Sequence, residues 1–261
     1  MVGGGQMGEA LIRGMINSGL VAAESITVAE PSATRREYLE TTYQVQGTDT
    51  PSQLAKSKTI ILAIKPQIME PVLAQYQEHL SAEHLIISIA AGVTINQLEQ
   101  GIGADKKIIR VMPNTPALVL AGASALSGNK NTDKEDLKIG QAIFSAVGTC
   151  VEVAENLLDA VTGLSGSGPG YVFTFLEAMI DGGVLAGLPR PIAEQLALQT
   201  LYGSAKLALE SGEPAAVLKG KVTSPGGTTI TGLQVMEKAG LRGTMMETVW
   251  AAAERSKELG Q

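Results

Sequence analysis

The stretch VGGGQMGEALIRG, residues 2–14, decides the fold class. Gly3, Gly5 and Gly8 form the pattern G-x-G-x-x-G, and apolar residues at helical spacing follow it. In a dinucleotide-binding fold the first glycine allows a tight turn, the second lets the backbone approach a pyrophosphate, and the third lets the helix pack closely on the sheet. The free N–H groups at the start of such a helix favour phosphate. The pattern alone also fits a purely structural turn, so its context decides between the two.

That context is an alternation of strands and helices. We predict strands at 25–30, 59–64, 84–90 and 106–112, with helices at about 32–42 and 67–80 among them. Alternation of this kind is typical of a parallel doubly wound sheet, and the run TIILAI at 59–64 fits a strand that is buried on both faces. The sequence therefore predicts an α/β protein with an N-terminal Rossmann-type dinucleotide-binding domain over residues 1–155.

The start of the chain does not fit this pattern. Only Met1 and Val2 precede Gly3. The first strand of a dinucleotide-binding fold is normally central and buried on both sides, and two residues cannot form it. We therefore expect that the natural chain begins several residues earlier, with an apolar strand.

The end of the 25–30 strand carries two conflicting signals about the cofactor. Glu30 stands about 20 residues after Gly8, where a carboxylate accepts a hydrogen bond from the ribose 2′-hydroxyl of NAD. Ser32, Arg35 and Arg36 follow, and such hydroxyl and guanidinium groups suit the 2′-phosphate of NADP. The two arginines also fit an ordinary solvated helix face. We predict NADPH as the cofactor, with NADH as the alternative.

The second half of the chain is different in character. Apolar residues recur at helical spacing after 170, a second helix starts near Pro191, and a third closes the chain. These helices are rich in Ala and Gly, and their apolar faces are wider than a monomer usually exposes. We predict an all-helical dimerisation domain over residues 156–261 and an intertwined homodimer. In the alternative, these faces cover each other within one chain.

Composition argues against several classes of protein. The formal net charge is −6 and no basic stripe is present, which argues against a nucleic-acid partner. Cys150 stands alone, so we read it as inert, and the two histidines, His79 and His84, suit neither a metal site nor a Ser-His-Asp triad. We see neither a secretory leader nor a membrane span. We expect a cytoplasmic protein with no metal site.

Six motifs are spread over essentially the whole chain. They are GGGQMGEALIRG (3–14), ILAIKPQ (61–67), SIAAGV (88–93), RVMPNTPA (110–117), SGSGPGY (165–171) and VTSPGGTTITGL (222–233). Together they resemble one enzyme family, pyrroline-5-carboxylate reductase, and the last motif is similar to the signature segment of that family. Gly170 departs from the pattern, because the family commonly has Ala there.

The resemblance implies an activity and an assembly. Members of this family use NAD(P)H to reduce 1-pyrroline-5-carboxylate, a small cyclic imine acid, to L-proline in the last step of proline biosynthesis. The resemblance also implies that the C-terminal domain binds the substrate and that the active site lies at the interface of a homodimer. It leaves a larger oligomer open.

The 222–233 segment is the predicted substrate cradle. Its small residues leave N–H and O–H groups free to hold a carboxylate, and Pro225 stiffens the turn. A protonated imine is already a strong electrophile, so the chemistry demands position more than a strong acid. By resemblance, Thr229 also donates a hydrogen bond to the ring nitrogen. In the alternative, the threonines merely cap a helix. We expect Ser224 and Thr229 to be catalytic and the substrate to contact Ser224, Gly226, Gly227, Thr228 and Thr229.

The predicted cofactor site gathers residues from several motifs. Lys65 ends a strand at the carboxyl edge of the sheet, where ligands bind, although a solvated charge would look the same. By resemblance, the 61–67 turn and Asn114 lie beside the nicotinamide. The expected cofactor contacts are Gly3, Gly5, Gln6, Met7, Gly8, Glu30, Ser32, Arg35, Ala63, Lys65, Pro66, Ala91 and Asn114.

Two other functions compete with this interpretation. A 3-hydroxyacid dehydrogenase of similar build would need a catalytic lysine on the helix after the 165–171 motif, where this chain has Val172, and no lysine lies between Lys138 and Lys206. A non-catalytic NADP-binding regulator would have no need of the cradle. Both alternatives are therefore disfavoured by particular residues.

Overall fold

The computed structural model describes residues 1–54 and 56–260 and divides the chain into two compact units. The first unit comprises Met1–Ser167 and Val249–Gln261, and the second comprises Gly168–Thr248. The predicted boundary between residues 155 and 156 lies inside the first unit.

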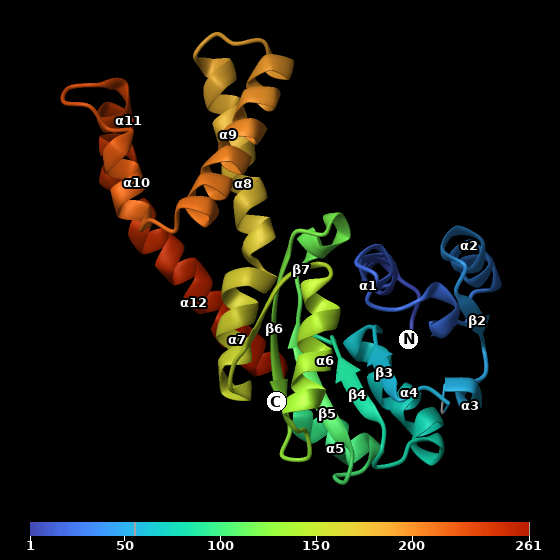
Figure 1. Ribbon diagram of the computed structural model, residues 1–261. Helices are drawn as coiled ribbons and strands as arrows, with labels where there is room; N and C mark the ends of the chain where they lie inside the picture. The colour runs from blue at the N-terminus through green and yellow to red at the C-terminus, as the bar shows by residue number, and fades with distance from the viewer. Residues whose placement is uncertain (55, 261) are drawn as a thin grey trace. The chain divides into compact units, whose positions relative to one another are not determined.

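The first unit is built on a twisted β-sheet (Figure 1). Its strands are β1 (Thr27–Ala29), β2 (Gln46–Thr48), β3 (Thr59–Leu62), β4 (Leu85–Ser88), β5 (Lys107–Met112), β6 (Gly122–Gly128) and β7 (Gly148–Glu152). Strand β1 pairs with β2, and β3 to β7 pair in numerical order. Val2 forms parallel bridges to both Ala29 and Leu62, so the N-terminal residues join the two groups of strands.

Four of these strands confirm the sequence prediction, and three were not predicted. The predicted strands are present as β1, β3, β4 and β5. Strand β6 runs antiparallel to β5, because the short turn at Thr115–Val119 reverses the chain without a crossover helix. The sheet is therefore mixed, although the prediction was a parallel one. Strand β6 reads GASALSG and lacks the β-branched residues that mark a strand.

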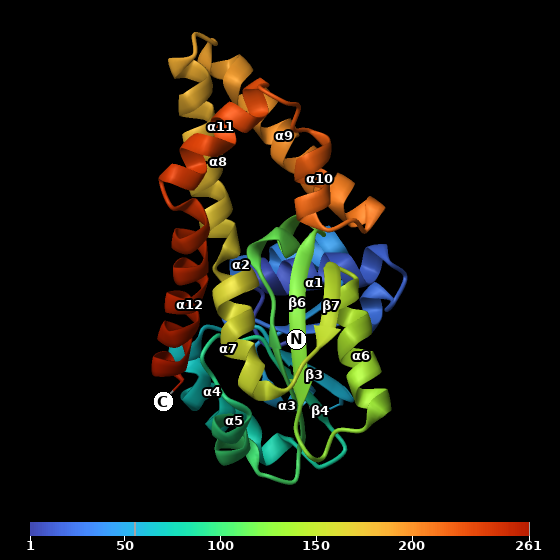
Figure 2. The same ribbon diagram turned by 90° about the vertical axis from the view of Figure 1, so that its left-hand side faces the viewer.

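Helices cover both faces of this sheet, as the doubly wound prediction requires (Figures 1 and 2). Ile61, Ile87 and Ile109 belong to one core cluster with α1 (Gln6–Asn17) and α6 (Lys134–Ser145). The alternate residues Ile60, Ile86 and Ile108 belong to a second cluster with α4 (Met69–Tyr76) and α5 (Ile95–Ile102). Each such buried isoleucine contributes about 1.5–3 kcal/mol. The helices α2 (Ala33–Tyr43), α3 (Pro51–Leu54) and α7 (Leu158–Val161) complete this unit's α-helices before residue 168.

The last residues of the chain also pack in the first unit. A π-helical turn at Thr162–Gly166 follows α7, and a Cβ on Gly163 would lie 2.5 Å from the Val249 carbonyl oxygen. The Ser256 hydroxyl donates to the Asp159 carboxylate at 2.6 Å. The C-terminal half of α12 (Leu241–Leu259) is thus fixed to α7 and to the π-helical turn.

The second unit is all-helical, as predicted. It contains α8 (Gly168–Leu185), α9 (Arg190–Ser211), α10 (Ala215–Lys221), α11 (Thr228–Lys238) and the start of α12. Helices α8 and α9 form an antiparallel pair in which Gly183 faces Ala193. Among the described apolar residues of this unit, only Ala193 and Ala197 are buried. No helix among the residues described has the length and apolar character needed to cross a bilayer.

Candidate active site

The three glycines of the G-x-G-x-x-G pattern lie in different structural settings. Gly3 has a φ of +92°, and a Cβ there would lie 2.5 Å from the Ala63 carbonyl oxygen. A Cβ on Gly8 would lie 2.5 Å from the Gly3 carbonyl oxygen. Gly5 instead borders open space, because a Cβ there would meet no atom within 4 Å, and it is the N-cap of α1. The turn therefore leaves room for a ligand only at Gly5, beside the free N–H groups of α1.

A cavity of about 570 Å³ opens at this turn. It lies at the carboxyl ends of β1 and β3, where open α/β sheets bind ligands. Five of the predicted cofactor contacts line it together: Gly3, Gly5, Glu30, Ala63 and Lys65. The chain thus brings the fingerprint, the ribose position and the 61–67 turn to one cavity.

Glu30 is held rigidly at one wall of this cavity. Its Oε2 accepts the Gly4 N–H at 2.9 Å, and its Oε1 accepts the Ser32 N–H at 3.1 Å. These two hydrogen bonds fix the orientation of the carboxylate. A fixed negative charge at this position suits a ribose 2′-hydroxyl. The Ser32 hydroxyl accepts the Arg35 N–H at 3.4 Å and so caps α2.

Arg35 is held by partners that sequence reasoning did not identify. Its Nε donates to the Gly4 carbonyl at 2.6 Å, and its Nη2 pairs with the Glu9 carboxylate. The guanidinium lies 4.9 Å from the centre of the Tyr38 ring. Glu9 also accepts the hydroxyls of Tyr38 at 3.0 Å and Tyr43 at 2.7 Å. Burial raises the pKa of Glu9, but the hydrogen bonds from Arg35 and the two tyrosines outweigh it and lower that pKa.

The neighbouring Arg36 also forms its hydrogen bonds and its ion pair with residues around Glu30. One of its nitrogens donates to the carbonyls of Glu30 at 2.5 Å and Pro31 at 3.0 Å, and another lies 3.5 Å from the Asp49 carboxylate. Both arginines therefore stabilise the loop around Glu30. A 2′-phosphate at this wall would meet two guanidiniums already shared with carboxylates and carbonyls, together with the charge of Glu30.

The remaining predicted cofactor residues lie in different settings. Lys65 is exposed where β3 ends, directly before the 3₁₀ turn Pro66–Ile68. Gln6 and Met7 form the first turn of α1, and Ala91 is exposed in the turn after β4. Ala91 is not part of the cavity wall.

Asn114 is also outside the cavity wall, and its side chain is fixed within the first unit. Its Nδ2 donates to the Ser165 carbonyl at 3.0 Å, and its Oδ1 accepts the Ala123 N–H at 2.9 Å. Asn114 therefore ties the end of β5 to β6 and to the π-helical turn. Its structural partners are clear, while its predicted contact with the nicotinamide stays a prediction.

The predicted substrate cradle lies in the second unit, at the start of α11. Gly226 has a φ of +67°, which favours glycine, and Gly227 is the N-cap residue without any side-chain cap. The capping alternative for Thr228 and Thr229 is therefore wrong, since both already lie inside the helix. Within the described parts of the chain, the hydroxyls of Ser224, Thr228 and Thr229 make no hydrogen bond.

The start of α11 can hold an anion. An 11-residue helix presents free N–H groups and a partial positive charge at its first turn, and the unpaired hydroxyls stand beside them. Gly226 borders open space, and the Ser224 hydroxyl lies directly beside Gly227, since a Cβ on Gly227 would be 2.3 Å from it. This is the arrangement that a small carboxylate needs for close approach.

The other reactive side chains are placed elsewhere. Cys150 is buried, and burial raises the pKa of its thiol to about 11. The His84 ring nitrogen Nδ1 accepts the Ser81 N–H at 2.8 Å. Over residues 1–54 and 56–260, no group of three or more His, Cys, Asp or Glu side chains is arranged to hold a metal ion.

Comparison with known proteins matches both halves of the chain. Residues 155–259 match the family model described as pyrroline-5-carboxylate reductase dimerisation. Residues 1–92 match the model described as NADP oxidoreductase, coenzyme F420-dependent. A pyrroline-5-carboxylate reductase of Synechocystis is 50% identical over 262 residues, covering 100% of this chain and 97% of that protein.

Solved structures agree with these matches and decide the family. A pyrroline-5-carboxylate reductase from Coxiella burnetii has a TM-score of 0.96 at 35% identity, and one from Plasmodium falciparum, solved with NADP bound, has a TM-score of 0.87 at 37% identity. Each alignment covers 100% of this chain and 97% of the other. The resemblance predicted from six motifs is thereby confirmed. The chain belongs to the pyrroline-5-carboxylate reductase family and is an NAD(P)H-dependent reductase of 1-pyrroline-5-carboxylate.

Proposed function

We propose that the start of α11 holds the carboxylate of 1-pyrroline-5-carboxylate while the cavity at Gly5 holds the pyrophosphate of NADPH. One observation carries this assignment: Ser224, Thr228 and Thr229 stand at a helix start with hydroxyls that have no partner in the described residues. Hydroxyls without partners, beside the free N–H groups of a helix start, are groups that can hold an anion.

The proposed mechanism divides the work between substrate position and cofactor position. The cradle fixes the ring through its carboxylate, with the N–H groups of Thr228 and Thr229 in the first turn of α11 as donors. The Gly227 N–H already donates to the Ser224 carbonyl at 3.1 Å. NADPH supplies hydride to the imine carbon. Because hydride transfer needs the two reacting atoms in near contact, most of the rate enhancement comes from this positioning.

Thr229 is the proposed contact to the ring nitrogen. Its hydroxyl is free of internal hydrogen bonds and stands in the first turn of α11. An O–H group at hydrogen-bond distance from the nitrogen orients the ring and stabilises the lone pair that forms there as hydride arrives. Ser224, on the opposite side of the glycine pair, is the second proposed hydroxyl contact.

On the cofactor side, we propose that each wall of the first-unit cavity holds a different part of NADPH. The turn from Gly3 to Gly8 takes the pyrophosphate, Glu30 with Ser32 and Arg35 takes the adenosine ribose, and the turn at Ala63, Lys65 and Pro66 takes the nicotinamide ribose. Ala91 and Asn114 complete the nicotinamide end. The cavity of about 570 Å³ that contains five of these residues supports the assignment.

We further propose that the enzyme works as a homodimer with its active site at the interface between subunits. The second unit exposes large apolar side chains along its long helices, among them Val172, Phe173, Leu196, Leu198 and Leu209. A helical unit that buries only two alanines is not stable as an isolated monomer. The family match over 155–259 describes a dimerisation domain, which supports a partner of the same kind.

The activity is tested by following NADPH oxidation with 1-pyrroline-5-carboxylate, with NADH in place of NADPH, and with a 3-keto acid in place of the imine. We expect oxidation that requires the cyclic imine, at rates that differ between the two cofactors. Oxidation with the 3-keto acid would favour the dehydrogenase alternative. NADPH binding without any turnover of the imine would favour a regulator. The cytoplasmic location stays a prediction, which cell fractionation tests.

A further inference from the structure

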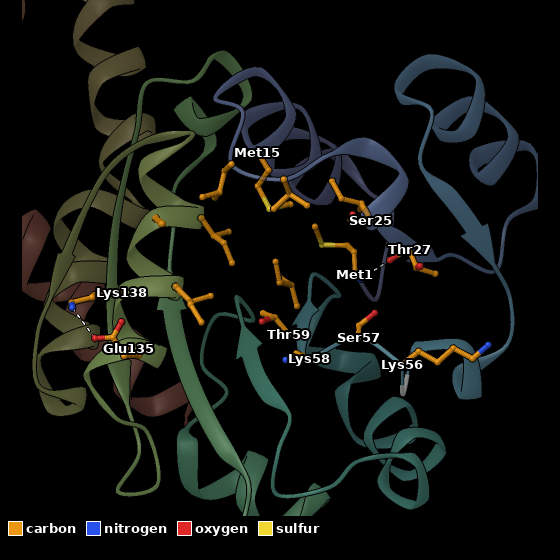
Figure 3. Close-up of a pocket in the computed structure, with 17 residues that line it drawn as sticks. Met1, Met15, Ser25, Thr27, Lys56, Ser57, Lys58, Thr59, Glu135 and Lys138 are labelled. Atoms are coloured by element: carbon orange, nitrogen blue, oxygen red, sulfur yellow. Dashed lines mark hydrogen bonds and ion pairs between the residues drawn. The ribbon is translucent and has the colours of Figure 1, made fainter.

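Two cavities of the first unit differ in the basic residues beside them. The cavity in Figure 3 lies at the amino ends of β1 and β3 and has a volume of about 540 Å³. Its basic residues are Lys56, Lys58 and Lys138, and Lys138 pairs with Glu135 at 2.8 Å. The cofactor cavity, at the carboxyl ends of the same strands, has two arginines beside its Glu30 wall. Arginine can hold phosphate through two parallel hydrogen bonds, whereas lysine acts as a point charge, so these arginines are the groups that can distinguish NADPH from NADH.

Of the two arginines, Arg36 is fixed to the loop that carries Glu30. One of its terminal nitrogens donates to the carbonyls of Glu30 at 2.5 Å and Pro31 at 3.0 Å. A ligand that drew this guanidinium away would break both bonds and release the loop. Arg36 is therefore the less available of the two for a phosphate.

Arg35 has a different set of partners. Its Nε donates to the Gly4 carbonyl and its Nη2 pairs with Glu9, while its Nη1 makes no hydrogen bond within the described residues. The side chain is 28% exposed. The Gly4 N–H donates to Glu30, so Arg35 and Glu30 are bonded to the same residue of the glycine turn. Arg35 can thus turn to a phosphate by exchanging a single charged partner.

That partner, Glu9, is held firmly in place on α1. Its Oε1 accepts the hydroxyls of Tyr38 at 3.0 Å and Tyr43 at 2.7 Å, and its Oε2 pairs with Arg35. The two tyrosines keep the carboxylate from following Arg35 towards a ligand. Burial raises the pKa of Glu9, but the hydrogen bonds from Arg35 and the tyrosines outweigh it and lower that pKa, so Glu9 is charged at neutral pH.

The charges around Glu30 leave little room for another anion. Contacts among the described residues connect three acidic residues, Glu9, Glu30 and Asp49, with two basic ones, Arg35 and Arg36. Each arginine therefore already has a carboxylate partner. A phosphate adds a charge of about −1.5 to −2 at pH 7, so its binding here depends on how tightly the nearest carboxylate holds its arginine.

We propose that Glu9 is a specificity-determining residue of the cofactor site: its carboxylate competes with the 2′-phosphate of NADPH for the Arg35 guanidinium and so lowers the preference for NADPH over NADH. The inference rests on the proposed function, in which the adenosine ribose lies at Glu30, Ser32 and Arg35. Glu9 itself touches neither cofactor and acts through Arg35. The Nη2 of Arg35 is the atom for which carboxylate and phosphate compete.

The variant Glu9→Gln tests this in the full-length protein. Glutamine keeps the size of the side chain and an oxygen for the tyrosine hydroxyls, but it has no charge with which to hold Arg35. We expect kcat/KM for NADPH to rise about fivefold, equivalent to about 1 kcal/mol, through a lower KM. NADH has a hydroxyl in place of the 2′-phosphate and should gain far less, so the ratio between the two cofactors should rise.

A binding measurement removes hydride transfer from the test. Adenosine 2′,5′-bisphosphate and 5′-AMP differ only in the 2′-phosphate, and titration calorimetry gives the Kd of each. In Glu9→Gln the Kd of the bisphosphate should fall about fivefold, while the Kd of 5′-AMP should change little. Neither nucleotide contains nicotinamide, so this result does not depend on turnover.

Two further variants show whether the effect passes through Arg35. Glu37→Gln removes the same charge from an exposed position of α2 that has no ion pair within the described residues, and it should leave the cofactor ratio as it was. Arg35→Met should weaken binding of the bisphosphate more than binding of 5′-AMP. In the Arg35→Met background, Glu9→Gln should have no further effect, because the two residues act as one unit.

An unchanged or lower cofactor ratio in Glu9→Gln would overturn the proposal, and a lower ratio would mean that Glu9 positions Arg35 for the phosphate. The proposed function fails in a different way. If Arg35→Met weakened both nucleotides equally, or neither, the adenosine ribose would not lie at this wall. That result would overturn the assignment of the wall together with the role of Glu9.

Discussion

The two units of this chain differ in how much apolar surface each buries within itself. The first unit packs helices on both faces of a sheet and buries large side chains such as Phe144, Leu98 and Ile86 almost completely. The second unit buries only Ala193 and Ala197 and exposes most of its large apolar residues. The first unit has a cavity of about 570 Å³ at its glycine turn, whereas the second leaves large apolar side chains uncovered, as the proposed dimer requires. Cofactor binding and turnover should therefore respond to different substitutions.

The largest expected effect comes from a charge on the exposed face of the second unit. Phe173 is 63% exposed on α8. If α8 lies in the proposed dimer interface, Phe173→Asp should weaken the dimer about 10³-fold, or about 4 kcal/mol, because an aromatic contact is replaced by a buried charge. Turnover should fall with the dimer, while NADPH binding persists. Light scattering, turnover and fluorescence titration with NADPH measure the three quantities.

The control for this prediction is Lys206→Asp, which puts the same carboxylate at a charged position on α9. It should leave the dimer intact. If Phe173→Asp remained a dimer with normal turnover, α8 would not contribute to the interface.

The next largest effect is confined to the cradle. Thr229→Val keeps the shape of the side chain and removes the hydroxyl, so kcat should fall about 10²-fold while the Kd for NADPH stays near normal. The matched control is Thr231→Val on the same helix α11, whose hydroxyl donates to the Gly227 carbonyl at 3.1 Å. It should affect kcat far less. A collapse of NADPH affinity in Thr229→Val would contradict the separation of the two sites.

A pair of glycine substitutions separates folding from binding in the first unit. Gly8→Ala places a methyl group 2.5 Å from the Gly3 carbonyl oxygen and should lower the free energy of unfolding by about 1–3 kcal/mol. Gly5→Ala meets no atom within 4 Å, so the protein should fold normally but bind NADPH poorly, because the methyl group takes the place of phosphate. Thermal melts and NADPH titration give both readouts. Equal melting temperatures for the two variants would refute the assigned roles.

The smallest effect concerns the choice of cofactor. Glu30→Gln removes the fixed negative charge at the ribose wall, so kcat/KM for NADPH relative to NADH should rise about tenfold, equivalent to about 1.4 kcal/mol. The amide keeps one acceptor for the Gly4 N–H. Steady-state kinetics with both cofactors measure the ratio, and Asp49→Asn, at the outer edge of the same wall, is the control. An unchanged ratio would mean that Glu30 only supports the loop.

Local sequence rules predicted the features that depend on neighbouring residues. The glycine turn, the buried strand at 59–64 and the position of Glu30 after β1 follow from backbone sterics and from the period of apolar residues. Strand β6 was missed because its small residues give no such period. Strand β7 is short, and its place in the sheet depends on pairing with β6.

The candidate site also depends on contacts that local sequence patterns do not predict. The resemblance predicted a substrate cradle at 222–233, but which residue caps α11 depends on the backbone of Gly226, which only the structure shows. Glu9 of α1 pairs with Arg35 and accepts the hydroxyls of Tyr38 and Tyr43, so these contacts join α1 to α2. In the sequence, each of these residues alone resembles an ordinary helix surface position. An acidic residue directly after the glycine fingerprint, with tyrosines on the next helix, was the available signal.

The return of residues 249–260 to the first unit has a consequence for synthesis. In chain order the second unit is an insertion, because the chain leaves the first unit at Ser167 and re-enters it at Val249. The Asp159–Ser256 hydrogen bond and the packing at Gly163 therefore cannot form until translation is almost complete. We expect the first unit to leave the ribosome only partly folded, with its π-helical turn exposed to solvent. Its folding should be completed only after the C-terminal half of α12 has been synthesised and released.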